Sequence, residues 1–347
     1  MAQTRLEVNL EAWDTTRVDD LISAAATDLS QPANQQDLET AILISRKMDY
    51  RNGVVNGSDL MLGQQAKQKD FTGQLRSLLQ LLNFLHRHPK DPKLPVALHE
   101  TGNIYLRYGV YHKAIGSYEE CKGYLDERNE QLYYPNTRNL ARAYQLNNRY
   151  DSARTEFATA LNLAQQDNKV HEMLWIFQQQ ANMAHREEKF DKELKWYQLA
   201  YTLADSNRMV EERVMALNNI GYAYRFLQEP KQAENYFAQV LASSSNKAET
   251  EAVIRQNLGI LYQNEKDYDQ AVKAFSRAAN LYSELKDKRQ EALIYDFLAL
   301  TYYQRNDMYN AQVYNGRSID LANNRADALD VLQSCCRTKS LIHQELF

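Results

Sequence analysis

One spacing pattern constrains the fold of this chain more than any other feature. A small residue is followed twelve positions later by a second small residue, and four positions after that by an aromatic residue. Gly221, Ala233 and Phe237 show the pattern most clearly. It recurs about every 40 residues, with the first small residue at Gly102, Ala141, Ala181, Gly221, Gly259 and Ala299. Such a repeat has to be interpreted before any single motif, because it indicates a stack of similar units.

Each unit is predicted to contain two helices. In the stretch from Ala216 to Phe226 the apolar residues are spaced three and four apart, which is the spacing of one helix face. Pro230 follows a short break and suits the first turn of a second helix, where its missing N–H costs nothing. Equivalent polar breaks occur at Asn147–Arg149, Arg186–Lys189, Asn264–Asp267 and Arg305–Asp307. Turns this short favour antiparallel helix pairs.

The small residues have a packing role. Two helices approach closely only where their side chains are small, so we expect the first small residue to face an Ala of the second helix, with Tyr and Phe filling the space around them. One pair cannot bury its apolar face alone, and neighbouring pairs therefore stack into a solenoid. Two positions depart from the pattern, because Glu193 replaces Ala and Asn315 replaces an aromatic residue. These repeats are expected to pack less tightly or to turn the stack locally.

The frame extends upstream in weaker form. Gly63 leads to Leu75 and Leu79, and a still weaker copy starts at Ala26. We expect an N-terminal extension over residues 1–17, degenerate helical repeats over 18–90, six repeats over 91–322 and a C-terminal capping helix over 323–347. Solenoids need a helix to cover the last exposed face. A connection to a further domain, or a dimer contact, is the alternative role for that last segment.

These residues resemble the tetratricopeptide repeat. Its small, Tyr, Ala and aromatic positions correspond here to Gly221, Tyr224, Ala233 and Phe237. The resemblance implies an all-α solenoid of antiparallel helix pairs wound as a right-handed superhelix, with about seven to eight repeats. The longer unit of about 40 residues is similar to the arrays of bacterial (Bacteroidetes-type) sensor and regulatory signalling proteins, of kinesin light chain and of cell-polarity adaptors.

Composition and the length of apolar runs give no indication of several common classes of protein. The net charge of −4, with 25% charged residues, is no reason to expect a nucleic-acid partner. No apolar run has the length of a signal peptide or a membrane span, which predicts a cytoplasmic chain. A periplasmic location is the alternative if an upstream signal peptide has been removed. Cys121 and the adjacent Cys335 and Cys336 have neither disulfide nor metal spacing, and the role of the adjacent pair stays open.

The chain shows no motif for catalysis. It lacks the glycine-rich nucleotide loops, the nucleophile elbow and the paired-histidine zinc motif. His86 and His88 are two apart, so they point to different sides of a helix. Adjacent acids such as Glu187 and Glu188 are explained by solvated helix ends. We therefore expect no enzyme activity, no cofactor and no metal.

The remaining candidate is the concave face, which the resemblance assigns to the first helix of each pair. Positions three before, one after and four after the small residue are expected to point inwards. The candidate partner-binding residues are His99, Asn103, Arg138, Arg142, Gln178, Asn182, His185, Asn218, Tyr222, Arg225 and Gln256. In the last unit Asp296 occupies the same kind of position. Asn219 is expected to lie to the side of this face.

The chemistry of these residues favours peptide binding. Asn and Gln carry both a donor and an acceptor, so they can bind a peptide backbone whatever its side chains. Arg138 and Arg142 share one helix face, where they can hold an acidic ligand. We expect a non-catalytic protein- or peptide-binding scaffold in signalling or regulation. The alternative is the sensor region of a larger histidine kinase or phosphatase whose output domain lies outside this chain.

Overall fold

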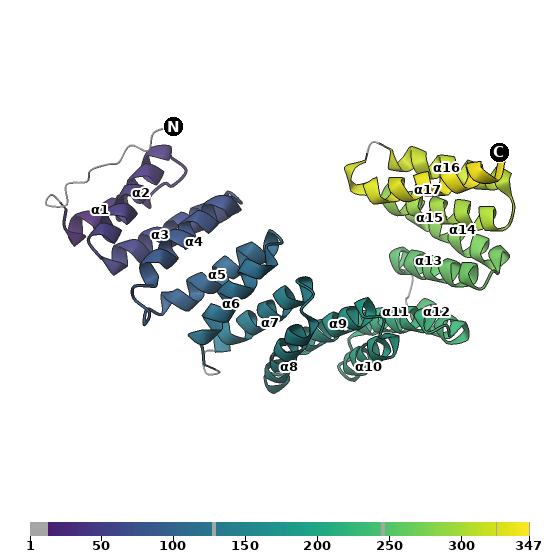
Figure 1. The fold of residues 1–347 in the computed structure, drawn as a ribbon, viewed down its shortest axis with the longest axis horizontal. Helices are drawn as coiled ribbons and strands as arrows, with labels where there is room; N and C mark the ends of the chain where they lie inside the picture. Colours follow the sequence, from purple (N-terminus) through teal and green to yellow (C-terminus); the bar gives the residue numbers. More distant parts are fainter. Residues whose placement is uncertain (1–12, 127–129, 244–246, 324, 347) are drawn as a thin grey trace. The chain divides into compact units, whose positions relative to one another are not determined.

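The structure, a computed structural model, describes residues 13–126, 130–243, 247–323 and 325–346. Within these ranges the regular elements are helices and no β-strand occurs (Figure 1). The chain divides into two compact units, the first ending at Asn168 and the second beginning at Lys169. Most of the expected N-terminal extension lies outside the described residues. The first helix begins at Thr15, with the side chain of Asp14 accepting the N–H of Arg17.

In both units consecutive helices pack against one another along the chain. The helices of the first unit are α1 (Thr15–Ala25), α2 (Pro32–Lys47), α3 (Arg51–Lys67), α4 (Phe71–Leu85), α5 (Lys93–Arg107), α6 (Tyr111–Gly123), α7 (Glu130–Leu146) and α8 (Tyr150–Gln166). Those of the second unit are α9 (Val170–Arg186), α10 (Phe190–Ser206), α11 (Val210–Phe226), α12 (Pro230–Ser243), α13 (Ala248–Asn264), α14 (Tyr268–Glu284), α15 (Lys288–Gln304), α16 (Met308–Ala322), the short 3-10 helix η2 (Ala326–Ala328) and α17 (Leu329–Leu346). Pro230 begins α12, and the four predicted breaks separate α7 from α8, α9 from α10, α13 from α14 and α15 from α16, so these boundaries are confirmed.

Most turns between the described helices close without glycine, and the α5–α6 turn, with Gly109 at a φ of 72°, is an exception. After α7, Asn148 has a φ of 59°, in the left-handed region, and the next N–H, of Arg149, bonds back to the carbonyl of Tyr144 at 2.9 Å. Ten described non-glycine residues adopt such a positive φ, nearly all at helix ends. The conformation costs about 1–2 kcal/mol relative to the right-handed region. Packing of the helix pairs on both sides of the turn compensates for this cost.

The small residues lie where the helices of a pair meet. A Cβ atom added at Gly221 would lie 2.7 Å from Cε1 of Phe237, and one added at Gly259 would lie 2.5 Å from the ring of Phe275. The expectation of close approach is confirmed. The neighbour is different, because the atoms nearest to the glycine belong to the aromatic ring rather than to the facing Ala. The aromatic side chain crosses directly over the space that the glycine leaves open.

Both departures from the repeat pattern are buried polar groups. Glu193 is fully buried, and its Oε2 atom lies 2.9 Å from Nδ1 of His185. Asn315 is also buried, and its Nδ2 atom donates to the carbonyl of Cys335 at 2.9 Å. Each polar substitution in the pattern thus has a specific hydrogen-bond partner, as buried polar groups require.

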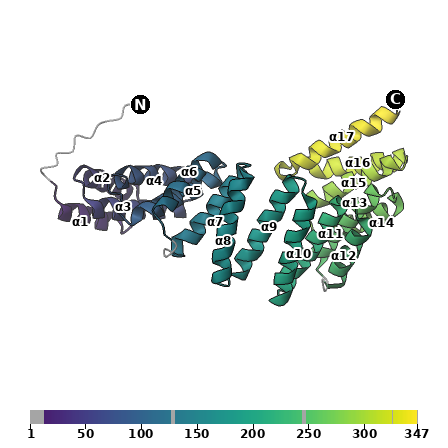
Figure 2. The same ribbon diagram turned by 60° about the horizontal axis from the view of Figure 1, so that its bottom comes forward.

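At the C-terminal end of the second unit, α17 packs against α16 and α15 (Figure 2). Val331 and Cys335 of α17 share a buried apolar cluster with Ala292 and Ala322. The hydroxyl of Ser334 donates to Oδ2 of Asp296 at 2.6 Å. α17 therefore covers Asp296, one of the positions expected to point into the concave face. No described helix is long and apolar enough to cross a membrane.

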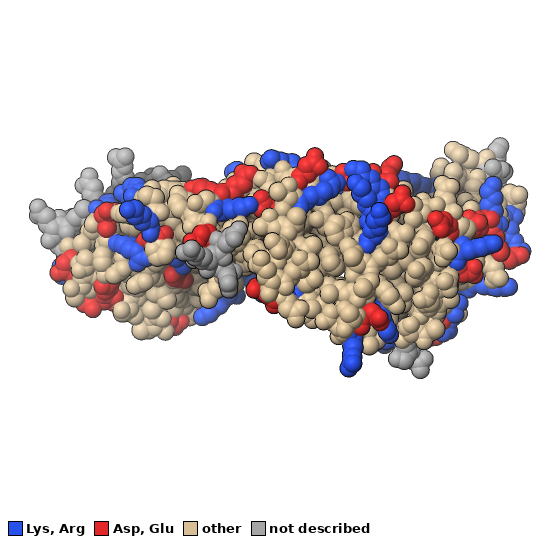
Figure 3. Space-filling model, turned by 90° about the horizontal axis from the view of Figure 1, so that it is seen from below, with Lys and Arg blue, Asp and Glu red and all other residues tan. Residues whose placement is uncertain are grey.

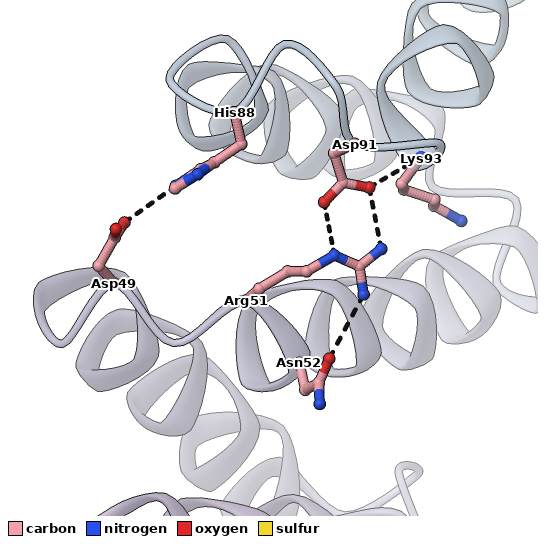
Figure 4. A network of polar contacts seen from close by, with 6 residues as sticks. All are labelled: Asp49, Arg51, Asn52, His88, Asp91 and Lys93. Carbon is pink, nitrogen blue, oxygen red and sulfur yellow. Dashed lines mark hydrogen bonds and ion pairs between the residues drawn. The ribbon is translucent and has the colours of Figure 1, made fainter.

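In the first unit a polar network joins two turns (Figure 4). Arg51, at the start of α3, donates from Nε and Nη2 to the two carboxylate oxygens of Asp91, at 2.6 and 2.9 Å. Asp91 precedes α5, is nearly fully buried and also accepts the N–H of Lys93. The contact ties the α2–α3 turn to the α4–α5 turn, across 40 residues of sequence. His88 and Asp49 form a second, more exposed contact beside it.

Candidate partner-binding surface

Five side-chain amides form a continuous hydrogen-bonded row in the second unit, which we call the amide ladder. It consists of Asn182 and Gln178 from α9, Asn219 and Asn218 from α11, and Asn257 from α13. Gln178 Nε2 donates to Asn182 Oδ1 at 3.0 Å, and Asn219 Nδ2 donates to Gln178 Oε1 at 3.0 Å. Asn218 Nδ2 donates to Asn219 Oδ1 at 3.3 Å, and Asn257 Nδ2 donates to Asn218 Oδ1 at 2.9 Å. The row connects the first helices of three consecutive pairs.

The hydrogen bonds of the amide ladder hold the five side chains in defined orientations. Some of the amide donors and acceptors remain available for further hydrogen bonds. All five side chains are half-buried rather than enclosed. Among the described residues, Asn218 Nδ2 donates one hydrogen bond, whereas a primary amide carries two N–H groups. Gln178 Nε2 donates twice, to Asn182 and to the hydroxyl of Tyr197. Asn218 Nδ2 thus keeps donor capacity, whereas Gln178 Nε2 already makes two hydrogen bonds.

An apolar pocket of about 410 Å³ adjoins the ladder between α11 and α13. Asn218 lines it together with Val214 and Ile254. Three apolar side chains at the pocket are unusually exposed for their type: Val210 at 55%, Met215 at 62% and Val253 at 41%. The charged lining residues are Glu211, Lys247 and Glu249, of which Glu211 and Lys247 form an ion pair. An open apolar pocket beside oriented amides is suited to an apolar side chain of a bound chain.

An aromatic cluster surrounds His185 at the ends of α9 and α11. The imidazole lies 4.8 Å from the Phe226 ring and 5.6 Å from the Tyr222 ring, measured between centroids. The Arg225 guanidinium lies 4.6 Å from the Tyr222 ring centroid, within cation–π range. Burial lowers the pKa of Arg225 and raises the pKa of Glu193, which contacts His185. His185, Tyr222 and Arg225, three of the predicted residues, are thus together in one cluster.

In the first unit a comparable contact joins α5 to α7. Asn103 Oδ1 accepts from the Tyr118 hydroxyl at 2.7 Å and from Asn139 Nδ2 at 2.8 Å. His99 is buried, its Nδ1 lies 3.2 Å from Asn136 Oδ1, and burial lowers its pKa. Asn103 is half-buried and therefore more available to a partner than His99.

The predicted arginine pair of α7 is half-buried and already hydrogen-bonded within the chain. Arg138 donates from Nε to Asn139 Oδ1 at 3.3 Å, and Arg142 donates from Nη1 to Gln145 Oε1 at 2.8 Å. In the second unit, Gln256 of α13 accepts from the hydroxyl of Tyr282 at 3.1 Å. The structure therefore places each of the eleven predicted residues on a first helix, with ten of them half-buried.

Three ladder-type residues lie outside the predicted set. Asn139, Asn219 and Asn257 each stand two positions before the small residue of their repeat. Each donates to an amide on the first helix of the preceding repeat. The sequence carries a signal for them, because this offset is an amide in four consecutive units. The prediction missed these residues because it assigned the inner face of the first helix to other offsets from the small residue.

The charged groups, the potential metal ligands and the Cys121 thiol were each considered as the basis of another kind of site. On the face drawn in Figure 3, Lys and Arg are interspersed with Asp and Glu, with uncharged areas between them. No group of three or more His, Cys, Asp and Glu side chains that could hold a metal occurs in the described ranges. Cys121 is buried, and burial raises the pKa of its thiol to about 12, so it is no nucleophile at neutral pH.

Comparison of the sequence with protein families identifies the repeat. One tetratricopeptide-repeat model matches residues 249–334 and another matches residues 213–245. The predicted resemblance is therefore confirmed. No curated protein matches the sequence at a significant level.

Solved structures with similar folds include the apo form of RapI, which is 13% identical with a TM-score of 0.61 over 94% of this chain and 99% of that one. The apo form of the quorum sensor NprR from B. thuringiensis is 13% identical, with a TM-score of 0.54 over 88% of this chain and 87% of that one. The signal-transduction ATPase PH0952 from Pyrococcus horikoshii, which has a tetratricopeptide repeat sensor, is 16% identical, with a TM-score of 0.55 over 96% of this chain. This chain spans 52% of that protein. The predicted all-α solenoid of tetratricopeptide type is confirmed.

Proposed function

Given that residues 213–245 and 249–334 are tetratricopeptide repeats, we propose that the chain is a non-catalytic scaffold that binds a protein or peptide segment along its first helices. The observation that carries the proposal is the amide ladder leading to the apolar pocket between α11 and α13. The two features supply the two kinds of contact that an extended peptide needs, one for its backbone and one for a side chain.

The amide ladder provides the backbone contact. A peptide backbone presents one N–H and one C=O per residue, and a side-chain amide can satisfy either. Because hydrogen bonds between Asn218, Asn219 and Asn257 already fix their orientation, binding requires little further loss of side-chain freedom. This recognition is independent of the partner's sequence.

The apolar pocket provides selectivity. Val210, Met215 and Val253 leave apolar surface exposed to water around it. Full burial of one Leu or Met side chain contributes about 1.5–3 kcal/mol, enough to favour segments with an apolar residue at that place. The polar amides beside the pocket then set the position of the partner's backbone.

The arginine pair of the first unit would favour an acidic partner. Arg138 and Arg142 lie on one face of α7, and guanidinium groups bind carboxylates with two parallel hydrogen bonds. A ligand carboxylate would have to compete with Asn139 and Gln145 for them. The interspersed charges of Figure 3 give no support to a nucleic-acid partner.

Affinity capture from the native cell, followed by mass spectrometry, tests the proposal. Val253→Asp places a charge at the pocket and should reduce capture of specific partners at least tenfold. Leu199→Asp is the matched control, because Leu199 is exposed to a similar degree, at 48%, but lies on α10 outside the pocket. Equal loss in both variants, or loss in neither, would contradict the proposal. Helical content by circular dichroism must stay unchanged.

A second pair of variants tests the acidic preference separately. Arg138→Glu combined with Arg142→Glu reverses two charges on α7 and should weaken capture of acidic partners. If the same partners are captured at the same strength, the arginines are no anchor, and the pocket result stands on its own.

The second candidate function is the sensor region of a larger signalling protein. It is supported by the fold shared with a quorum sensor and with the sensor-bearing ATPase from Pyrococcus horikoshii. A reading frame that continues past Phe347 into a kinase or phosphatase would favour it.

A further inference from the structure

A second pocket, of polar character, lies in the first unit between α2, α3 and α4. Its volume is about 520 Å³. Six glutamine side chains line it, together with hydroxyl groups and two arginines, Arg46 and Arg76. The apolar pocket beside the amide ladder lies in the second unit, between α11 and α13, whereas this one lies in the first unit and is lined by residues of α2, α3 and α4. It is therefore a different pocket from the one beside the amide ladder.

Three buried polar atoms of the pocket residues have no hydrogen-bond partner among the described residues. They are Nε of Arg46, Oγ of Ser58 and Oε1 of Gln65. Ser58 is only 1% exposed. A buried polar atom left unpaired costs about 1–3 kcal/mol, so native proteins rarely leave such atoms without a partner. Three residues that line one pocket each keep such an atom, which favours a polar ligand group there.

Arg46 shows which charge that group carries. Its Nη1 atom donates to Gln80 Oε1 at 3.0 Å, which holds the guanidinium between α2 and α4. The described residues provide no ion pair for it, and burial lowers its pKa. Of the two acids that line the pocket, Asp70 accepts the N–H of Gly73 as the cap of α4, and Glu39 is exposed. A partly desolvated guanidinium without a carboxylate favours a negatively charged ligand.

The free edge of the guanidinium is compatible with an oxyanion. With Nη1 engaged by Gln80, the Nε edge is the one left to donate. Two parallel N–H donors on one edge match two oxygens of a carboxylate or a phosphate. The Ser58 hydroxyl can donate to a further oxygen, and the glutamine amides can bond the polar remainder of the ligand.

We propose that this pocket binds a small molecule bearing a carboxylate or phosphate group, with Arg46 as the main anchor and Ser58 as a second donor. Because the pocket is built from three helices, its occupation should stabilise the first unit. A ligand that binds only the folded state raises the unfolding midpoint as its concentration rises above the Kd.

Titration of the full chain with sodium phosphate, and separately with sodium acetate, at constant ionic strength tests the proposal. Binding is followed by isothermal titration calorimetry and by the thermal unfolding midpoint. Wild type should bind at least one of the two anions, and the stronger response identifies the kind of group. Arg46→Gln should weaken binding at least tenfold. Lys67→Gln is the matched control, because it removes one exposed positive charge of α3 outside the pocket and should leave binding unchanged.

Ser58→Ala keeps the test decisive if Arg46→Gln does not fold. It removes an unpartnered hydroxyl, so the chain should remain folded while its anion affinity falls. The proposal is wrong if neither anion binds and the pocket holds only water. It is also wrong if Arg46→Gln and Lys67→Gln weaken binding equally, or if glycerol at the same concentration stabilises the chain as much as the anions do.

Discussion

The Nδ1 atom of His185 lies 2.9 Å from the Oε2 atom of Glu193, inside the helix pair α9–α10. His185 is one of the residues predicted for the partner-binding surface, and Glu193 is the residue that replaces Ala in the repeat pattern. Glu193 is fully buried, and its Oε1 atom has no hydrogen-bond partner among the described residues. The departure from the pattern has therefore brought a carboxyl group into the packed interior of the pair, directly behind an aromatic cluster on the candidate surface.

This pair makes stability depend on pH. Burial raises the pKa of Glu193 above its ordinary value of 4.5. Its contribution to stability is therefore fully present below the unfolded-state pKa and is lost as the pH rises through the folded-state pKa. Glu193→Gln removes this titration, so its stability relative to wild type should increase as the pH is raised above 4.5. Urea unfolding at a series of pH values measures this.

The exposed Glu188→Gln serves as the control for that series, because it removes a carboxylate of the neighbouring turn. The free energy of unfolding of this variant should change with pH in parallel with that of wild type. Parallel curves for Glu193→Gln as well would show that burial of Glu193 has no energetic consequence.

The space at Gly221 is needed by Phe237. A Cβ at position 221 would lie 2.7–3.2 Å from three atoms of the ring, so Gly221→Ala forces the ring or the helices to move. We expect a loss of about 1–3 kcal/mol in the free energy of unfolding. Gly316→Ala provides the opposite control, because Gly316 lies in the interior of α16 with nothing within 4 Å of its Cβ position.

At Gly316 the substitution should stabilise the chain by about 0.5–1 kcal/mol, since Ala is the better helix former. The two variants are compared by urea unfolding. Effects of the same sign would contradict the assignment of Gly221 to helix packing.

Asp91 should matter more to stability than its neighbour His88 (Figure 4). Asp91 is 3% exposed and bonded twice by Arg51, whereas His88 and Asp49 are both substantially exposed. Asp91→Ala should cost about 1–3 kcal/mol, and His88→Ala less than about 1 kcal/mol. Arg51 lowers the pKa of Asp91, so acid should remove the stabilisation as the pH falls below 3.8.

Thermal unfolding of both variants at neutral and acid pH provides the measurement. A His88→Ala variant that is as destabilised as Asp91→Ala would show that burial does not distinguish the two contacts.

Asn315 should hold α17 in place. Its side chain donates to the carbonyl of Cys335 within a buried interface. Asn315→Ala removes this hydrogen bond between α16 and α17, so amide hydrogen exchange within residues 329–346 should accelerate. Gln312→Ala, at an exposed position of the same helix, should leave the exchange of α17 unchanged. Unaltered exchange in the Asn315 variant would assign the attachment of α17 to its apolar contacts alone.

The candidate surface could be predicted only in part. The offsets along each first helix placed Gln178, Asn182 and Asn218 on one face, and the structure joins them in one ladder. The same offsets set Asn219 aside, although its amide links Gln178 to Asn218. A helical offset describes the direction of a side chain from its own axis, whereas a hydrogen bond also depends on the distance and rotation of the next helix.

The sequence by itself determined the all-α class, the helix pairs and the positions of close approach, because the helical period and the repeat length are visible within one stretch of chain. The division into residues 1–17, 18–90, 91–322 and 323–347 stays a prediction. Only the tertiary structure decided that Glu193 is buried behind His185, that Arg46 has no carboxylate partner among the described residues, and that an apolar pocket adjoins Asn218. These features depend on how consecutive helices stack, since burial and charge pairing arise between residues that are distant in the sequence.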